Sequence, residues 1–276
     1  MRRFMKRLRR ILLALVIALL AVAIWKRDDI TRLMAVNSLF SPSRIVSNFS
    51  NMPSLFFSRT INRSPGTVSD LPQGVPATLP PEVATWVMDR NVTSLLVMKS
   101  GVVVAEDYLL GTGPEDLRIS WSVAKSFLSA LVGVLLDDGT IESIDVPVTQ
   151  YAPLLIGSAY DGATLRDVLQ MQSGVRFDED YLAFNSDINR MGRILALGGS
   201  MDAFAAGLKE RDNPPGTKWQ YVSIDTHVVG MVVRGATGRS IPDLMAEKII
   251  GPLGFEADPV YLTDGDGVAF VLGGLN

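Results

Sequence analysis

Lys125 carries a charge in a segment whose other side chains carry none. It is the only charged residue between Arg118 and Asp137, and its helical neighbours three, four and seven positions later are leucine, serine and valine. Burying an ammonium group is costly unless the group is paired or loses its proton. The pattern therefore indicates a lysine with a chemical use, although a lysine that extends its amine to solvent at the start of a helix would have the same neighbours.

Ser122 lies three residues before Lys125, which is one helical turn away on the same side. A serine hydroxyl is a weak nucleophile until a neighbouring base removes its proton. A free lysine has a pKa of ~10.4, so a lysine that serves as this base near neutral pH needs a pKa about three lower, or ~4 kcal/mol. Desolvation and a nearby helix N-terminus both favour the neutral amine, and the N–H groups of that terminus can stabilise an oxyanion. We therefore predict an acyl-transfer site with Ser122 as nucleophile and Lys125 as base.

Tyr221 is a second candidate, on a predicted loop after the turn-forming stretch 213–216 and just before a predicted helix. A tyrosine on such a loop can reach into a cleft and pass a proton to a leaving group. The alternative is an ordinary half-buried tyrosine. His227, the single histidine, lies in an apolar helical run without an obvious acid partner, which favours a core histidine.

Several stretches together resemble the β-lactamase-related serine hydrolases, which include class C β-lactamases, family VIII-type esterases and 6-aminohexanoate-dimer hydrolases. The residues that carry the similarity are, in chain order, 121–127, 164–174 and 221–223, and residues 178–181 are most similar to the 6-aminohexanoate-dimer hydrolase branch. Ser-x-x-Lys alone is a weak motif, so the order and spacing of the stretches give the similarity its specificity. It covers roughly residues 80–276. It implies an α/β fold of the α+β type, β-lactamase/transpeptidase-like, in which an antiparallel sheet is flanked by helices and joined to a mainly helical region.

The resemblance also implies roles for individual residues. Ser122 is acylated, Lys125 accepts its proton and Tyr221 relays a proton to the leaving group. Tyr181 matches a substrate-contacting tyrosine on a mobile loop, with plain loop packing as the alternative. Ser223 stands at a substrate-binding position where the β-lactamases have asparagine, so efficient β-lactam turnover is not expected.

The reaction implied by the resemblance is hydrolysis of a small-molecule ester or amide through an acyl-serine intermediate, without metal or organic cofactor. Two other functions stay open: a penicillin-binding-like sensor that is acylated and not turned over, and a D,D-peptidase that acts on the cell wall. The identity of the substrate and the oligomeric state do not follow from the sequence.

The family's third motif, Lys or His followed by Thr or Ser and then Gly, is absent after Tyr221. Lys99-Ser100-Gly101 has the letters but precedes the nucleophile, and we predict that it forms a hairpin turn. We therefore expect residues 82–276 to be a catalytic domain that is incomplete at its C-terminus. Loss of one oxyanion-hole donor costs ~2.7–4 kcal/mol in other hydrolases, so we expect the chain as it stands to be nearly inactive.

Periodicity and turn residues predict the elements that position these side chains. The predicted hairpin pairs residues 93–98 with residues 102–105. Predicted helices and later strands follow in chain order: helices 122–136, 164–171, 225–234 and one from Ser240 that Gly251-Pro252 should stop, and strands 259–262 and 267–272.

The N-terminal residues 1–27 form a signal-anchor helix or a signal peptide. Six Lys/Arg residues within positions 2–10 precede an uncharged run from Ile11 to Trp25, which Lys26 and Arg27 close. Ala21-Val22-Ala23 fits a cleavage site, whereas the flanking bases favour an anchor. In either case we expect the remainder to face the periplasm or the exterior of a bacterial cell, bound to the inner membrane or secreted if the segment is cleaved.

Composition and charge exclude other classes. Hydrophobic residues make up 47% and there are no cysteines, which fits a globular chain without disulfides or a Cys/His metal cluster. Eight of the 26 basic residues lie in the first 27 positions, which leaves 18 against 29 acidic residues, a net charge of −11. A nucleic-acid partner is therefore not expected. We expect residues 28–81, rich in Pro and Ser but with several phenylalanines, to be an extended arm that packs on the domain.

Overall fold

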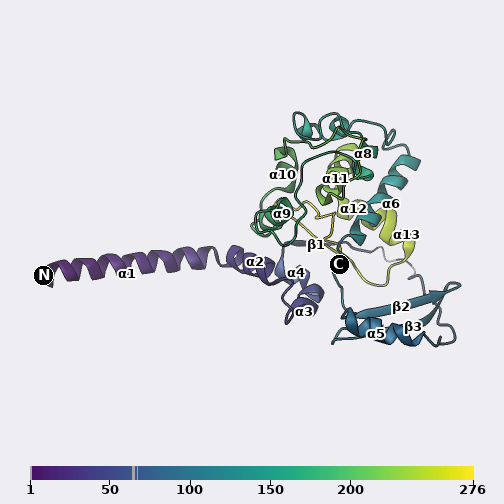
Figure 1. The fold of residues 1–276 in the computed structure, drawn as a ribbon, viewed down its shortest axis with the longest axis horizontal. Coiled ribbons are helices and arrows are strands. Elements are labelled where there is room, and N and C mark those ends of the chain that lie inside the picture. The colour runs from purple at the N-terminus through teal and green to yellow at the C-terminus, as the bar shows by residue number, and fades with distance from the viewer. Residues whose placement is uncertain (1, 64–65, 67) are drawn as a thin grey trace.

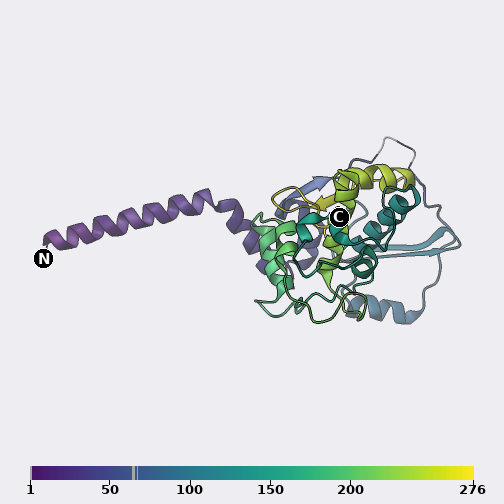
Figure 2. The same cartoon turned by 90° about the horizontal axis from the view of Figure 1, so that it is seen from above.

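The computed structural model describes residues 2–63, 66 and 68–276. One long helix, α1 (Arg2–Trp25), projects away from a body of helices and small sheets (Figure 1), as a perpendicular view confirms (Figure 2). The other helices are α2 (Arg27–Ser38), α3 (Ile45–Ser50), α4 (Met52–Leu55), α5 (Pro81–Asp89), α6 (Val123–Asp137), α7 (Val148–Tyr151), η1 (Pro153–Leu155), α8 (Leu165–Leu169), α9 (Asp187–Ala196), α10 (Met201–Gly207), α11 (Ser223–Thr237), α12 (Ile241–Met245), η2 (Ala246–Ile250) and α13 (Gly251–Leu253). The strands are β1 (Ser58–Thr60), β2 (Ser94–Lys99), β3 (Val102–Tyr108) and β4 (Val260–Leu262).

The predicted helices are present, with differences at their ends. Thr164 begins the predicted helix as the N-cap of α8, and the structure adds a complete capping box with Asp167. The prediction that Gly251-Pro252 ends the fourth helix is wrong, because α12, η2 and α13 follow one another without a break to Gly254, which adopts the left-handed conformation. In the π-helical turn η2 the backbone hydrogen bonds join residues five apart instead of four. Pro252 follows this turn at the start of α13, where its missing N–H breaks no regular α-helical hydrogen bond.

The strands form two separate antiparallel pairs rather than one sheet. The predicted hairpin is β2–β3, and Ser100 and Gly101 make its turn with φ of 52° and 83°. The second pair joins β4 to β1, a strand that the sequence patterns did not predict. Residues 267–272 were expected to form a strand, but they fold back on β4 as a loop. The N–H of Phe270 donates to Leu262 O at 2.8 Å. The chain then turns tightly, because the N–H of Gly274 donates to Phe270 O at 2.7 Å and a Cβ on Gly274 would lie only 2.8 Å from the same oxygen.

The arm 28–81 is helical in its first half, so the expectation of an extended conformation is wrong for that half. Helices α2, α3 and α4 follow one another to Leu55, and Phe49 and Phe56 pack against the core. A helix satisfies its own backbone hydrogen bonds while presenting such side chains on one face, which an isolated extended segment does not do. The segment does pack on the body, as its phenylalanines suggested.

One helix is long and apolar enough to cross a membrane, namely Phe4–Trp25 within α1. Its side chains are exposed in the described residues, and α2 follows it after a change of direction at Lys26. This is the feature that the sequence predicted as an anchor or a signal peptide.

Helix α11 is the centre of the core. Ten consecutive residues from Ile224 to Val233 are buried, and the helix contacts α6, α7, α8, α10 and α12. Gly235 lets it approach α7 closely, since a Cβ at this position would lie 1.8 Å from Tyr151 O. A buried helix of this kind fixes the residues just before its N-terminus, where Tyr221 lies.

Asp225, on the first turn of α11, is a fully buried carboxyl group. Its Oδ1 accepts hydrogen bonds of 2.8 Å from Tyr160 and from Ser173, while Oδ2 has no partner among the described residues. Burial, the main cause, raises the pKa of Asp225 to about 7. The Asp225 carboxyl group therefore connects α11 to the loop at Tyr160 and to Ser173 in the turn after α8.

We predict that replacing Asp225 with asparagine removes part of the pH dependence of stability. The folded-state pKa of about 7 lies above the ~3.9 of an unfolded aspartate, so the folded state holds an extra proton between these values and the free energy of unfolding falls as pH rises through this window. The loss is on the order of 4 kcal/mol. In denaturant titrations, Asp225→Asn and the parent protein should be similarly stable near pH 4, and the variant should be the more stable above pH 7. An equal pH slope in both proteins would contradict this.

Candidate active site

Ser122 stands at the N-terminus of α6, directly after a strained residue. Trp121 has φ of 45°, in the left-handed region that a bulky residue seldom adopts, and such a conformation costs on the order of 1–3 kcal/mol. The Trp121 ring stacks on Phe40 with centroids 5.5 Å apart and meets Phe49 edge-on at 5.4 Å. The arm thus holds the turn that presents Ser122.

Three predicted residues meet at the serine hydroxyl. Ser122 Oγ lies 2.7 Å from the Tyr221 hydroxyl, and Lys125 Nζ donates to Ser122 Oγ at 3.0 Å. Both side chains therefore touch the oxygen that would attack a substrate. Within the described part of the chain, the N–H of Ser122 donates to no backbone carbonyl, which leaves it free at the helix N-terminus.

Lys125 has no carboxylate partner in an ion pair among the described residues. Its remaining hydrogen bond runs to the carbonyl oxygen of Leu272 at 2.6 Å, and its Nζ lies 5.5 Å from the centroid of the Tyr221 ring. Desolvation lowers the pKa of Lys125 below its ordinary value, against smaller opposing effects from Tyr221 and the Glu179 charge. The environment therefore favours the neutral amine, which is the form that can accept a proton.

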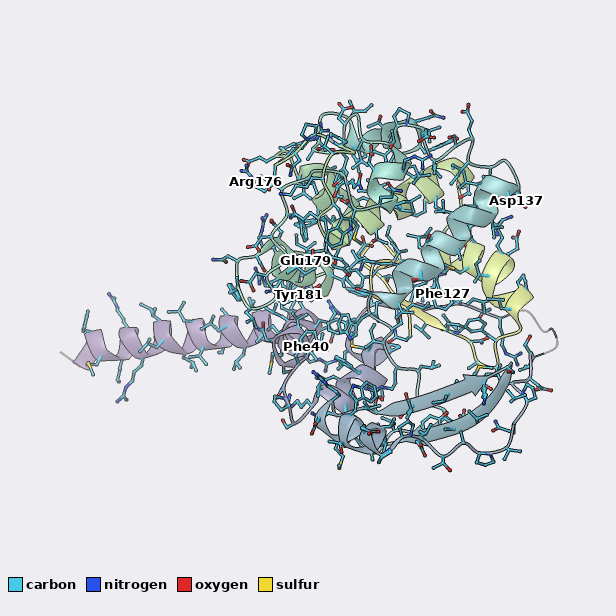
Figure 3. The ribbon with its side chains drawn as sticks, turned by 45° about the vertical axis from the view of Figure 1, so that its right-hand side comes forward. Phe40, Phe127, Asp137, Arg176, Glu179 and Tyr181 are labelled. Carbon is cyan, nitrogen blue, oxygen red and sulfur yellow. The ribbon has the colours of Figure 1, made fainter. Side chains whose placement is uncertain are left out.

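Glu179 joins the other two predicted residues. Its carboxylate accepts hydrogen bonds from the Ser223 hydroxyl, from Ser223 N at 3.0 Å and from the Tyr181 hydroxyl at 2.9 Å. Figure 3 shows Glu179 and Tyr181 next to each other on the side of the body where α2 attaches. Burial, followed by the Glu179 charge, raises the pKa of Tyr181 to about 12. Glu179 lies within residues 178–181, which resemble one family branch, but no sequence pattern marks it as a partner of Ser223.

The remaining motifs lie away from the hydroxyl. His227 is buried, and its Nε2 lies 2.8 Å from Asp202 Oδ1, so it is a core histidine, but the prediction that it lacks an acid partner is wrong. Asp202 is 25 residues earlier in the chain, which hid the pair from local pattern analysis. Lys99 lies at the hairpin end, as expected. No group of three or more metal-ligating side chains is present in the described ranges.

Ser186-Asp187-Ile188-Asn189 caps α9 and anchors the loop that carries Tyr181. Ser186 accepts from Asn189 N, and Asn189 Nδ2 donates to Tyr181 O at 3.0 Å and to Ala183 O at 2.9 Å. These residues therefore have a structural role in holding the loop that carries Tyr181.

A cavity of about 680 Å³ opens beside Ser122. Lys125, Tyr181 and Ser223 line it together with residues of α2, α4, α9 and the loop 270–273. A volume in this range accommodates a small organic substrate. The arrangement places the Ser122 hydroxyl and the desolvated Lys125 amine at the wall of a substrate-sized space.

The family model described as beta-lactamase matches residues 87–263. A 6-aminohexanoate-dimer hydrolase from Paenarthrobacter ureafaciens is 30% identical over 205 residues, which are 72% of this chain and 52% of that protein. A D-aminopeptidase from Cereibacter sphaeroides is 33% identical over 136 residues, 48% of this chain and 24% of that protein. The chain thus spans about half or less of the length of these relatives.

Solved structures show the same fold. A candidate 6-aminohexanoate-dimer hydrolase from Bacillus anthracis superposes with a TM-score of 0.75 at 20% identity, over 87% of this chain and 66% of that one. A candidate beta-lactamase from Bacteroides dorei has a TM-score of 0.53 at 25% identity, over 70% and 57%. The predicted β-lactamase/transpeptidase-like fold is confirmed, and the chain belongs to the beta-lactamase family of serine hydrolases.

Proposed function

We propose that the protein hydrolyses a small-molecule ester or amide through an acyl-serine intermediate on Ser122. The observation that carries this proposal is the contact of one hydroxyl with both a desolvated lysine amine at 3.0 Å and a tyrosine hydroxyl at 2.7 Å. A nucleophile within reach of its base, in a substrate-sized cavity, is the arrangement that acyl transfer needs. The hydrolase and D-aminopeptidase relatives support both the reaction class and amides as substrates.

In this proposal the residues act in turn on the proton, the carbonyl carbon and the leaving group. Neutral Lys125 takes the proton of Ser122, whose Oγ bonds to the substrate carbonyl carbon. The Ser122 N–H, at the positive end of α6, donates to the oxyanion. As the leaving group departs, the Tyr221 hydroxyl gives it a proton and regains one from Lys125. A water molecule then attacks the acyl carbon. The same residues carry its proton back to Ser122 Oγ, whose bond to the acyl carbon breaks and releases the acid. Ser223 and Tyr181, held by Glu179, contact the substrate.

We propose in addition that α1 tethers the protein to a bacterial inner membrane with the body outside the cytoplasm. The apolar span Phe4–Trp25 and the cluster of basic residues before it support this orientation.

The tether predicts that the protein stays in the membrane pellet after alkaline carbonate washing. A variant with Leu15→Lys and Ile17→Lys places two charges in the span, each costing about 2.5–3.5 kcal/mol at its centre, and should reduce the pelleted fraction strongly. A variant with lysine at two exposed positions outside the span, Leu110→Lys and Leu154→Lys, is the control. Retention of both variants alike would remove the case for a tether.

The lysine role predicts a specific loss of turnover. Lys125→Met keeps the length of the side chain without the amine, and should lower kcat for a p-nitrophenyl ester by about 10²–10⁴-fold in the full-length protein. In the parent, kcat/KM should rise with pH along a limb that lies below the ~10.4 of a free lysine, since only the neutral amine is active. Lys99→Met, at the hairpin, is the matched control and should leave kcat and kcat/KM unchanged. Ser122→Ala should remove labelling by a fluorophosphonate probe. An active Lys125→Met protein would rule out this base.

The tyrosine role predicts an effect that depends on the leaving group. Tyr221→Phe keeps the ring and removes the proton donor, so kcat/KM for an amide or an alkyl ester should fall by about 10²–10⁴-fold. A p-nitrophenyl ester should be affected much less, because its leaving group departs without a proton. Tyr108→Phe, at an equally exposed tyrosine on the hairpin, is the control. Equal losses for both substrates in Tyr221→Phe would indicate a structural role alone.

A further inference from the structure

The cavity beside Ser122 has mainly apolar walls, with Asn37, Asn189 and Arg193 as polar residues on α2 and α9. Among its described lining residues, Lys125 and Arg193 are the only charged ones. Most of the others are aliphatic or aromatic, including Val36, Met52, Leu195 and Phe270. A substrate that fills this space therefore needs a long apolar portion next to its scissile carbonyl.

The apolar walls come from the elements nearest to the candidate membrane span. Helix α2 follows α1 directly and packs against α9, and Arg32 of α2 donates to Ala196 O at 2.7 Å. Both helices contribute cavity residues, among them Val36 from α2 and Leu195 from α9. Figure 1 shows α2 and α9 on the side of the body from which α1 projects. The part of the cavity remote from Ser122 therefore lies toward the base of α1.

Large apolar side chains stand exposed at the cavity mouth. Leu182 and Phe184 line the cavity while 97% and 68% of their surface is accessible. Figure 3 shows Tyr181 and Phe40, which also line the cavity, beside the helix that leads into α1. Apolar side chains gathered at one mouth mark a surface that meets another apolar phase.

We propose that the cavity binds the linear acyl chain of an amphiphilic ester or amide drawn from the membrane surface, with the carbonyl at Ser122 and the chain between α2 and α9. This inference rests on the proposed function, since it names the substrate class of the same serine. The exposed Leu182 and Phe184 face the membrane at the point where the chain enters. Burial of each methylene then strengthens binding about fourfold.

Gly192 offers a direct way to shorten the cavity. It lines the cavity from α9, and a Cβ at this position meets nothing within 4 Å. The Cβ of a leucine here therefore meets no neighbour, and the rest of the side chain would take up cavity space that the acyl chain needs. Gly133 on α6 is the matched control, since it is also helical with nothing within 4 Å of a Cβ, and it lies outside the cavity lining.

The experiment measures kcat/KM of the full-length protein on p-nitrophenyl acetate, butyrate, hexanoate and octanoate. We expect kcat/KM to rise along the series. In Gly192→Leu the ratio of octanoate to acetate should fall by at least about tenfold, whereas Gly133→Leu should keep the parent's ratio. A flat series, or the same ratio in Gly192→Leu and the parent, overturns the acyl-chain site. Hydrolysis of acetate with a flat series leaves the proposed function standing, whereas no hydrolysis of any ester and no adduct on Ser122 removes the proposed function itself.

A second measurement tests the membrane as the source. Phosphatidylcholine vesicles that contain p-nitrophenyl palmitate present the long-chain substrate only in a bilayer. The double variant Leu182→Ser and Phe184→Ser should hydrolyse this substrate at least about fivefold more slowly than the parent, because each apolar side chain at the interface contributes to binding. Leu154→Ser, at an exposed leucine of η1 outside the cavity lining, is the control. Equal rates in the rim variant and the parent overturn the membrane source.

Discussion

The amine of Lys125 is the constraint on which the site depends. An ammonium ion in this position has a serine hydroxyl and one carbonyl oxygen as hydrogen-bond partners and no described carboxylate in an ion pair, so desolvation opposes its charge. The body of the protein maintains this state by packing Leu128, Leu131 and Val132 of α6 into the core. A helix that moved outward would hydrate the amine and bring its pKa back toward the ordinary value. The lowered pKa of Lys125 and the packing of the core are therefore two consequences of the same helix position.

Segments far apart in the chain hold the residues next to Ser122 and Lys125 in place. The arm packs Phe40 and Phe49 against Trp121, whose strained backbone directly precedes Ser122. Arg118 bonds to Val46 O and Ser50 Oγ, which ties the same turn to α3. From the other end of the chain, Leu272 offers its carbonyl to Lys125. A tryptophan keeps a backbone conformation in the left-handed region only where its neighbours exclude other conformations. The arm therefore helps to support the site.

The sequence predicted what depends on local order and missed what depends on distant contacts. Ser122 and Lys125 are one helical turn apart, so their contact follows from helix geometry once the helix is identified. The start of α8 at Thr164 and the hairpin turn at Gly101 are equally local. Strand β1, the Asp202 partner of His227 and the Glu179 contact with Ser223 each join segments at least 25 residues apart. No periodicity encodes these pairings, and the arm became helical because tertiary packing of its phenylalanines outweighed its Pro- and Ser-rich composition.

Glu179 connects the chemistry to the apolar cavity. The carboxylate binds Ser223 at the start of α11 and Tyr181 on the loop whose next residues, Leu182 and Phe184, line the cavity mouth. Its charge also raises the pKa of Lys125, in opposition to desolvation, so any movement of the loop changes the proton affinity of the base. When a substrate displaces water from the cavity, desolvation of the amine increases and favours its neutral form further. In the proposed mechanism, a filled cavity and the position of Glu179 therefore act on the same quantity, the pKa of Lys125.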